Sequence, residues 1–357
     1  MNDYAVMHYP AANRVYAESS IRLLVSELRA FDERALGNRL ADIAETAIGG
    51  VGYVTFSAPE LSDLDIELLS NVSTLYALFE VEGELLRPLT VRGLDKFDSD
   101  LLTIQKYAGK TNELFTKLLL NVTALAIDEP SRMVRDRLRV LDPMCGRGTT
   151  LNHAMMYGYD ASGLDLDAKD FDEYTRFIKT WLKNKRIKHQ ADTAPIRRNH
   201  THLGRRLDIT LGVDKQSYKA GDALQVSYVN ADTVRSTEFF RSASFDLIVT
   251  DAPYGVQHGS RSGAGAPHRQ QRTGDLSRDP HRLLAEALPG WARLLRAGGA
   301  IGISWNELVL DRADLTGLVT DAGLDVLDSE AYLGFAHRVD QAINRDVLVA
   351  RKRTAQG

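Results

Sequence analysis

The 357-residue sequence predicts an α/β protein in which a small α+β unit precedes an open, mostly parallel sheet. Two observations carry this prediction. From Leu138 onward, short apolar runs alternate with helical segments, a pattern typical of a parallel sheet covered by helices on both faces. Before residue 86, strand and helix patterns follow a different order. We therefore expect two domains, 1–85 and 109–357, joined by a linker at 86–108.

The first 85 residues form the small unit. Arg14–Phe31 has apolar residues at helical spacing, and Gly49-Gly50 separates two strand-like runs, as in a hairpin. The predicted order is strand, helix, strand, strand, helix, strand, which is the ferredoxin-like pattern. The predicted strands are Tyr4–Tyr9, Ala41–Ile48, Val51–Phe56 and Leu75–Val81, and the predicted helices are Arg14–Phe31 and Leu61–Leu69.

The second domain begins with an amphipathic helix over Thr111–Ala126, which ends before Pro130. The sheet follows, and ligands of such sheets bind beyond the carboxyl ends of the strands. A long glycine-containing loop is expected over 255–280, a length that is typical of functional loops. The predicted strands are Leu138–Leu141, Ala161–Leu164, Phe245–Thr250, Ala300–Ser304 and Val347–Ala350, with helices near 149–157, 169–188, 281–296 and 307–322.

Composition excludes several classes of protein. Hydrophobic residues make up 44% and charged residues 26% of the chain, as in a globular protein. Cys145 is the single cysteine, which excludes an intramolecular disulfide and an all-cysteine zinc site. His200 and His202 lack neighbouring acids, so no metal is expected. No run is long enough for a membrane span and no secretory signal is visible, so we expect a cytoplasmic protein without membrane contact.

A glycine-rich turn follows the first strand of the predicted sheet. It reads DPMCGRGT from Asp142, and Gly146 and Gly148 let the backbone approach a ligand at the start of a helix. The dinucleotide fingerprint needs a third glycine at position 151, where the sequence has Leu. Asp165 ends the second strand at the spacing of an acid that binds ribose hydroxyls.

This turn, followed by Gly-Leu-Asp, resembles the cofactor motifs of class I S-adenosylmethionine-dependent methyltransferases, above all the branch that modifies exocyclic amines of nucleic-acid bases. The resemblance implies a Rossmann-like sheet and S-adenosylmethionine as cofactor. It also implies an Asp after the third strand that contacts the adenine, and Asp222 matches that place. The cofactor-binding residues implied are Asn112, Asp142, Pro143, Cys145, Gly146, Gly148, Thr149, Asp165, Leu166, Asp222 and Ala223.

A second motif, Asp251-Ala252-Pro253-Tyr254, follows the fourth strand and resembles the (Asp/Asn/Ser)-Pro-Pro-(Tyr/Phe) signature of amino-methyltransferases. An exocyclic amine is a poor nucleophile because its lone pair is delocalised into the ring. Asp251 and the carbonyl of Ala252 would accept hydrogen bonds from the amine N–H groups, and Tyr254 would stack on a base that has left its helix. These residues and Pro253 form the catalytic motif. Ala252 replaces the first proline, which removes a fixed φ angle and softens the loop.

Two basic stretches suit a nucleic-acid substrate, although the net charge is −4. Residues 176–206 contain Asp192 as their only acid, and the loop after the catalytic motif adds further arginines. Residues 1–100, in contrast, are acidic. The predicted nucleic-acid-binding residues are Lys183, Lys185, Arg186, Arg197, Arg198, Arg261, Arg269 and Arg272.

The motif order is most similar to that of the tRNA guanine-N2 methyltransferases of the THUMP-associated family. The chain is too short for a THUMP domain after its N-terminal unit, so RNA recognition would fall to the basic stretches or to a partner. The eukaryotic relatives use a small activator protein, for which the sequence shows no docking surface. The predicted target is thus N2 of guanine in tRNA or another RNA, and RNA is preferred to DNA as the substrate. The alternatives are a DNA adenine-N6 or cytosine-N4 methyltransferase and a non-catalytic binder, the latter motivated by Ala252.

Overall fold

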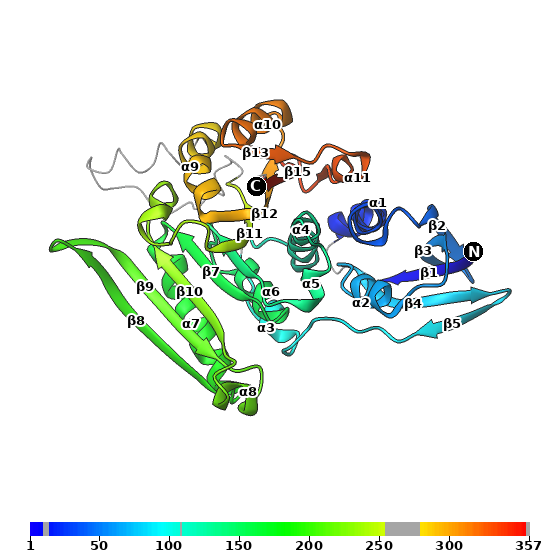
Figure 1. The fold of residues 1–357 in the computed structure, drawn as a ribbon, viewed down its shortest axis with the longest axis horizontal. Helices are drawn as coiled ribbons and strands as arrows, with labels where there is room; N and C mark the ends of the chain where they lie inside the picture. Colours follow the sequence, from blue (N-terminus) through cyan, green and yellow to red (C-terminus); the bar gives the residue numbers. More distant parts are fainter. Residues whose placement is uncertain (10–13, 108, 254–278, 355–357) are drawn as a thin grey trace.

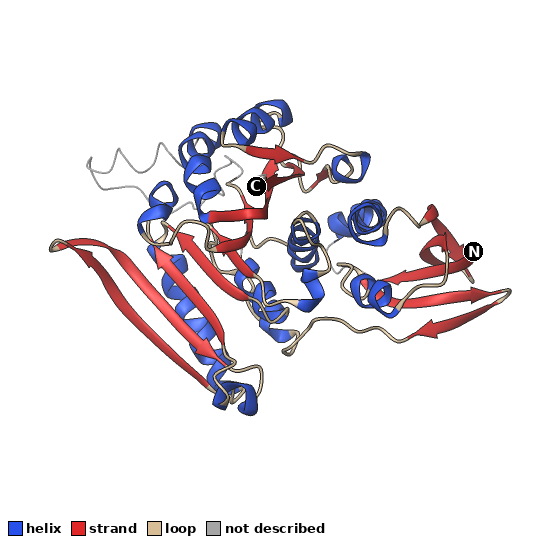
Figure 2. Cartoon of the chain, in the orientation of Figure 1, coloured by secondary structure: helices blue, strands red, loops and turns tan. Residues whose placement is uncertain are grey.

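The computed structural model describes residues 1–9, 14–107, 109–253 and 279–354. Two sheets organise this part of the chain (Figure 1). Helices α1 (Arg14–Phe31) and α4 (Glu113–Leu125) contact each other and lie between the two sheets (Figure 2). No helix in the described ranges has the length and apolarity that a membrane crossing requires.

The first sheet has the strand order β2-β3-β1-β4-β5, and every pairing in it is antiparallel. The predicted sequence of strands and helices in 1–85 is present. β5 pairs with β4 and so extends this sheet into the segment expected to be a linker. Its elements are β1 (Asn2–His8), α1, η1 (Asp32–Leu36), β2 (Ala41–Ile48), β3 (Val51–Ala58), α2 (Asp63–Leu69), β4 (Leu75–Glu82) and β5 (Leu85–Leu89).

The second sheet has the order β13-β15-β12-β11-β6-β7-β10-β9-β8, with β14 paired to β15. Its five central strands, β10, β7, β6, β11 and β12, are parallel. In chain order they are the third, second, first, fourth and fifth parallel strands, the 3-2-1-4-5 order of a doubly wound sheet. The strands are β6 (Arg139–Asp142), β7 (Asp160–Asp165), β8 (His189–Arg198), β9 (Thr201–Leu211), β10 (Leu224–Asn230), β11 (Phe245–Asp251), β12 (Leu295–Asn306), β13 (Leu324–Val326), β14 (His337–Arg338) and β15 (Asn344–Lys352).

Helices cover both faces of this sheet because successive strand residues point to opposite sides. Val140 and Leu247 join one core with α4, α6 and α7, whereas their neighbours Leu141 and Ile248 join a second core with α9 and α10. The helices are α3 (Asp100–Thr103), α4, α5 (Arg132–Arg135), α6 (Thr149–Met156), α7 (Ala168–Asn184), α8 (Lys215–Lys219), η2 (Thr233–Glu238), α9 (Pro280–Leu294), α10 (Arg312–Asp321) and α11 (Glu330–Leu333).

A buried polar network joins the two parts of the chain. The Glu27 carboxylate in α1 accepts hydrogen bonds from the Ser73 amide (3.0 Å) and from Nδ2 of Asn121 in α4 (2.7 Å). Asn121 Nδ2 also donates to the Asn71 carbonyl, and the Tyr157 hydroxyl donates to Asn121 Oδ1 (both 2.7 Å). The N-terminal unit is therefore packed on the helix that begins beside the candidate site.

The segment 189–220, for which the sequence predicts no strand, forms the antiparallel hairpin β8–β9 and the short helix α8. β9 pairs with β10, so the hairpin extends the sheet at its edge. Most β8 side chains are exposed, and the apolar alternation that identifies a half-buried strand is therefore weak there.

Candidate active site

The predicted motifs meet where the parallel strands β6, β7, β10 and β11 end, an edge we call the carboxyl edge. Asp142, Asp165 and Asp251 are the last residues of β6, β7 and β11. The chain changes direction here, because β6 has β7 on one side and β11 on the other. Ligands of doubly wound sheets bind at such a switch point. The fold thus brings three predicted carboxylates to one edge.

The glycine-rich turn is held against the end of β7. The Cys145 amide donates to the Leu164 carbonyl (3.0 Å), and the Gly146 amide donates to Oδ2 of Asp165 (2.8 Å). Gly148 has a φ of 77°, and a Cβ there would overlap the Tyr174 ring. Glycine is needed at this position for both reasons. Thr149 then begins α6, whose N-terminus faces the carboxyl edge.

Asp165 is oriented by the backbone before any ligand is present. Its Oδ1 accepts a hydrogen bond from the Asp167 amide (2.9 Å), in addition to the Gly146 contact at Oδ2. Burial raises the pKa of this carboxyl above its ordinary value. The neighbouring Leu166 is exposed, and its carbonyl accepts a hydrogen bond from Nδ2 of Asn230 (3.0 Å).

Asp142 is buried at the end of β6, next to the buried Pro143. Its Oδ1 accepts hydrogen bonds from Oγ1 of Thr250 (2.8 Å) and from the Met144 amide (3.1 Å). Burial raises the pKa of Asp142 to about 7 despite these hydrogen bonds, and the nearby Asp165 carboxylate raises it further. Asp142 can therefore gain or lose a proton near neutrality, and a cation bound beside it would favour the ionised form.

Asp251 is held by two hydroxyl donors and a nearby guanidinium, which come from different parts of the fold. Oγ1 of Thr111, just before α4, donates to Oδ2, and Oγ of Ser304 in β12 donates to Oδ1 (2.7 Å each). The Arg345 guanidinium in β15 lies 3.7 Å from Oδ2 and 4.4 Å from the centre of the Phe115 ring. Arg345 is only 5% exposed. These contacts fix the carboxylate direction in advance, which favours catalysis by positioning.

The rest of the catalytic motif is partly described. The Ala252 amide donates to the Ser304 carbonyl (2.7 Å), so the start of the loop follows β12 although the first proline of the signature is missing. Ala252 is buried and Pro253 is exposed. Tyr254 lies outside the described residues, as do Arg261, Arg269 and Arg272.

The structure corrects the placement of Asp222 and Ala223, which the sequence analysis put after the third parallel strand. Both precede β10 and lie at the opposite edge of the sheet. Asp222 forms an ion pair with Arg137, whose Nη1 also donates to the Ala223 carbonyl (3.1 Å). The segment LQVSYVN is the missed strand, so residues 230–232 hold the place that the resemblance assigned to Asp222.

Residues 230–232 contact the end of β7. The Ala231 amide and Nδ2 of Asn230 both donate to the Asp165 carbonyl (2.9 and 3.0 Å), and Asp232 caps η2 through the Val234 amide (3.0 Å).

Asn112, predicted to bind cofactor, caps α4 by accepting from the Leu114 amide (2.9 Å). Its neighbour Thr111 contacts the catalytic motif through the hydrogen bond to Asp251.

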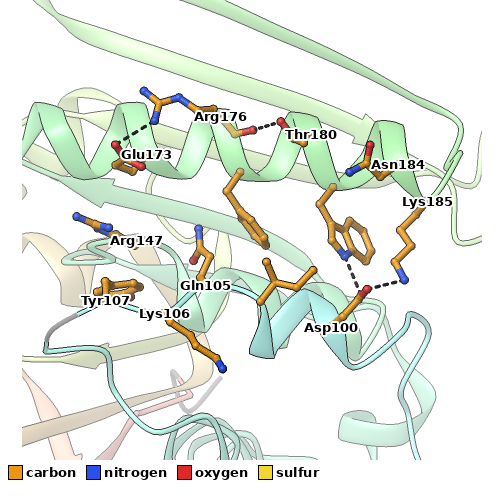
Figure 3. A pocket seen from close by; sticks show the side chains of 13 residues that line it. Asp100, Gln105, Lys106, Tyr107, Arg147, Glu173, Arg176, Thr180, Asn184 and Lys185 are labelled. Atoms are coloured by element: carbon orange, nitrogen blue, oxygen red, sulfur yellow. Dashed lines mark hydrogen bonds and ion pairs between the residues drawn. The ribbon is translucent and has the colours of Figure 1, made fainter.

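The predicted basic residues separate into two groups. Lys183, Lys185 and Arg186 lie at the C-terminal end of α7, away from the carboxyl edge because α7 starts at that edge. Lys185 forms ion pairs with Asp98 (2.7 Å) and with Asp100, as Figure 3 shows for the latter. Arg197 and Arg198, in contrast, end β8 in the hairpin.

A cavity of about 620 Å³ lies along α7 (Figure 3). Its lining includes Tyr107, Arg147, Phe177 and Trp181, and it contains none of the predicted cofactor-binding residues. Arg147 stacks on the Tyr107 ring at 4.6 Å and pairs with Asp170 at 2.9 Å. Among the residues that the structure describes, no group of three or more potential ligands could hold a metal ion.

The family comparison agrees with this geometry. Residues 124–270 match the family UPF0020, described as the RMKL-like methyltransferase domain. The match spans less than half of the chain, yet it contains Asp142, Asp165 and Asp251. It supports a methyltransferase domain in this segment and a class I methyltransferase as the protein class. No curated protein matches the chain.

Solved structures of methyltransferases are distantly similar to the chain. A TehB-like S-adenosylmethionine-dependent methyltransferase from Corynebacterium glutamicum is 17% identical, with a TM-score of 0.32 over 62% of this chain and 86% of that one. TehB from Haemophilus influenzae is 14% identical (TM-score 0.31, 62% and 60%). A methyltransferase from Methanosarcina mazei is 12% identical (TM-score 0.35, 61% and 93%). At such TM-scores these likenesses carry no argument about function.

Proposed function

We propose that the protein transfers a methyl group from S-adenosylmethionine to the exocyclic amine of a nucleic-acid base, and that the target is N2 of guanine in RNA. The observation that carries the proposal is the shared position of Asp142, Asp165 and Asp251 at the carboxyl edge, with the glycine turn held to Asp165. The same arrangement lies within the segment that matches a methyltransferase domain.

The residues at this edge fit the chemistry of the cofactor. Gly146 and Gly148 have positive φ angles that lead the backbone into the N-terminus of α6, where amide groups can face a ligand. Asp165 would accept hydrogen bonds from the ribose hydroxyls, and Asp142 would face the cationic part of the molecule. When bound, S-adenosylmethionine supplies an electrophilic methyl group on a sulfonium.

The catalytic motif would prepare the amine. Asp251 and the carbonyl of Ala252 would accept hydrogen bonds from the two N–H groups of the amine, so that the nitrogen lone pair is directed at the methyl group. The amine nitrogen would gain the methyl group as the bond to the sulfonium breaks, and it would release one proton. Thr111, Ser304 and Arg345 would keep the carboxylate in this orientation. Positioning and electrostatic stabilisation would then lower the activation barrier. No covalent intermediate with the protein is required.

The N-terminal unit is included in the proposal as a ferredoxin-like unit. Its element order and the strand order β2-β3-β1-β4 support this assignment, with β5 as an addition at the edge. Its role would be to hold α4, and with it Thr111, through the buried contact between Glu27 and Asn121.

The test is methyl transfer from radiolabelled S-adenosylmethionine to total RNA and to genomic DNA in parallel, followed by nucleoside mass spectrometry. N2-methylguanosine in RNA is the expected product, and the Asp251→Asn variant should lose it while still binding the cofactor. Methyladenine or methylcytosine in DNA would replace the RNA proposal. Cofactor binding without transfer to either nucleic acid would refute the proposed reaction.

A further inference from the structure

The hairpin β8–β9 projects from the sheet at the carboxyl edge. Asn230, the last residue of β10, pairs with Arg205, and the hairpin continues beyond this pair to its turn (Figure 1). Asn230 also pairs with Asp165 in β7. The projecting part, residues 196–206, is called the arm below. It leaves the sheet at the level of Asp165, on the side where the candidate site lies.

The arm is anchored at its base. Ile196 packs against the buried cluster of Leu164, Val229 and Ala231. The Arg205 guanidinium stacks on the Phe171 ring at 4.6 Å and pairs with Asp172 at 2.7 Å. These contacts to β7, β10 and α7 give the arm a defined direction.

The turn and a bulge also shape the arm. Asn199 and His200 have φ angles of 49° and 62°, the left-handed pair of a two-residue hairpin turn. Leu203 is an extra residue in β9, since Ile196 pairs with Gly204 and Arg197 with His202. Such a bulge bends a hairpin. A Cβ on Gly204 would overlap the Asn230 carbonyl, so glycine permits the close crossing over β10.

The charged side chains of the arm are all basic. No acidic residue occurs between Thr193 and Leu207, and the arginines at the tip are exposed. Arg197 and Arg198 follow each other in β8 and so point to opposite faces. Both faces of the arm thus carry a guanidinium, the group that binds phosphate oxygens in bidentate fashion. An acidic protein would present its complementary surface to one face of the arm, whereas the phosphate backbone of a nucleic-acid strand can contact both faces.

We propose that the arm binds the phosphate backbone of an RNA strand and thereby holds the strand whose target base enters the carboxyl edge. The inference rests on the proposed function, because the substrate class comes from there. The proposal also separates the basic residues of 176–206, one continuous stretch in the sequence, into two groups. The group at the end of α7 lies at the far edge and is not part of this surface.

The test compares two charge reversals of equal size. Arg197→Glu/Arg198→Glu changes the arm, and Lys183→Glu/Arg186→Glu changes the far end of α7 as the matched control. The probe is a fluorescein-labelled single-stranded RNA of mixed sequence, with DNA of the same sequence beside it. Fluorescence anisotropy gives the dissociation constant at a series of salt concentrations, and cofactor titration and thermal unfolding check that the variants are intact.

The arm variant should bind the RNA at least tenfold more weakly near 100 mM salt, and the control variant should bind like the wild type. The slope of log K against log salt should fall by about 0.7 for each lost phosphate contact, or about 1.4 for two. Because Arg198 contacts Glu238, the variant Arg197→Ala/His202→Ala serves as a milder second test that leaves this contact in place. It should reduce the slope by about 0.7.

Each outcome bears on one proposal separately. An equal loss in the arm and control variants, no RNA binding by the wild type, or a loss confined to DNA would overturn the arm proposal. Methyl transfer to RNA that persists in such a case leaves the proposed function standing. Arm-dependent RNA binding without any methyl transfer supports the arm and refutes the proposed function instead.

Discussion

Asp142 should make the free energy of unfolding depend on pH, and this dependence can be measured on the unliganded protein. Asp142 is 3% exposed, and its hydrogen bonds from Thr150, Thr250 and the Met144 amide do not offset the loss of water. Its pKa rises from an ordinary 3.8 to about 7. Well below pH 3.8 the group is protonated in both the folded and the unfolded chain, so it contributes no difference in stability. As the pH rises to 7, ionisation increasingly favours the unfolded chain.

The size of the effect follows from the two pKa values. Each pH unit between them corresponds to about 1.4 kcal/mol, so the cost of an ionised Asp142 above pH 7 is about 4 kcal/mol. The Asp142→Asn variant removes this cost and keeps an oxygen that accepts from Thr250 and Met144. Its free energy of unfolding should therefore exceed that of the wild type by about 4 kcal/mol at pH 8, and the gap should shrink toward pH 5.

Urea unfolding of both proteins between pH 5 and pH 8 measures this gap, with the exposed Asp314→Asn variant as control. S-adenosylmethionine should bind the wild type more tightly as the pH rises to 7, because its positive charge favours ionised Asp142. The affinity of Asp142→Asn should be weaker and nearly independent of pH. A gap that stays constant from pH 5 to pH 8 would refute the reasoning.

Three further substitutions test the site. Asp165→Ala should weaken cofactor binding by about 1–3 kcal/mol in calorimetry, the cost of unpaired buried groups, whereas Asp222→Ala at the opposite edge should not. Arg345→Met should lower kcat and leave the KM for cofactor unchanged. In an Asp251→Asn background it should add nothing, because Arg345 acts through that carboxylate; additive losses would contradict this. Gly148→Ala should cost about 1–3 kcal/mol in urea unfolding, since its Cβ meets an aromatic ring.

The sequence pattern predicted the parallel part of the sheet well, for a physical reason. Strands buried on both faces are continuous apolar runs. Those at Phe245–Thr250 and Ala300–Ser304 fall within β11 and β12, and Leu138–Leu141 overlaps β6 from Arg139 onward. β10 reads LQVSYVN, in which Gln225 and Ser227 interrupt the run, and it was missed. That omission moved the expected end of the third strand and led to the wrong placement of Asp222.

The candidate site was predicted only where a residue follows a parallel strand. Ser304 ends a predicted strand, so its position at the carboxyl edge follows from the sequence pattern. Arg345 could not be found by the same rule, because β15 is antiparallel and brings its first residues to the carboxyl edge. Thr111 precedes a helix, and its contact with Asp251 spans 140 positions in the chain.

The buried hydrogen bond between Glu27 and Asn121 joins the two units, and we expect it to couple their unfolding. The Glu27 carboxylate is fully buried in α1, and burial raises its pKa above the ordinary value. Glu27→Ala would leave the donors of Ser73 and Asn121 unpaired, at about 1–3 kcal/mol each. Asn121 belongs to α4, so the loss should destabilise the second unit as well as the first.

Tryptophan fluorescence separates the two units, because the three tryptophans are Trp181, Trp291 and Trp305, all in the second. Glu27→Ala should shift the urea midpoint of the fluorescence transition together with that of far-ultraviolet circular dichroism. The exposed Glu45→Ala variant should shift neither. If the fluorescence midpoint stays in place while the dichroism signal is lost earlier, the units unfold independently. The N-terminal unit would then not support the helix that presents Thr111 to the site.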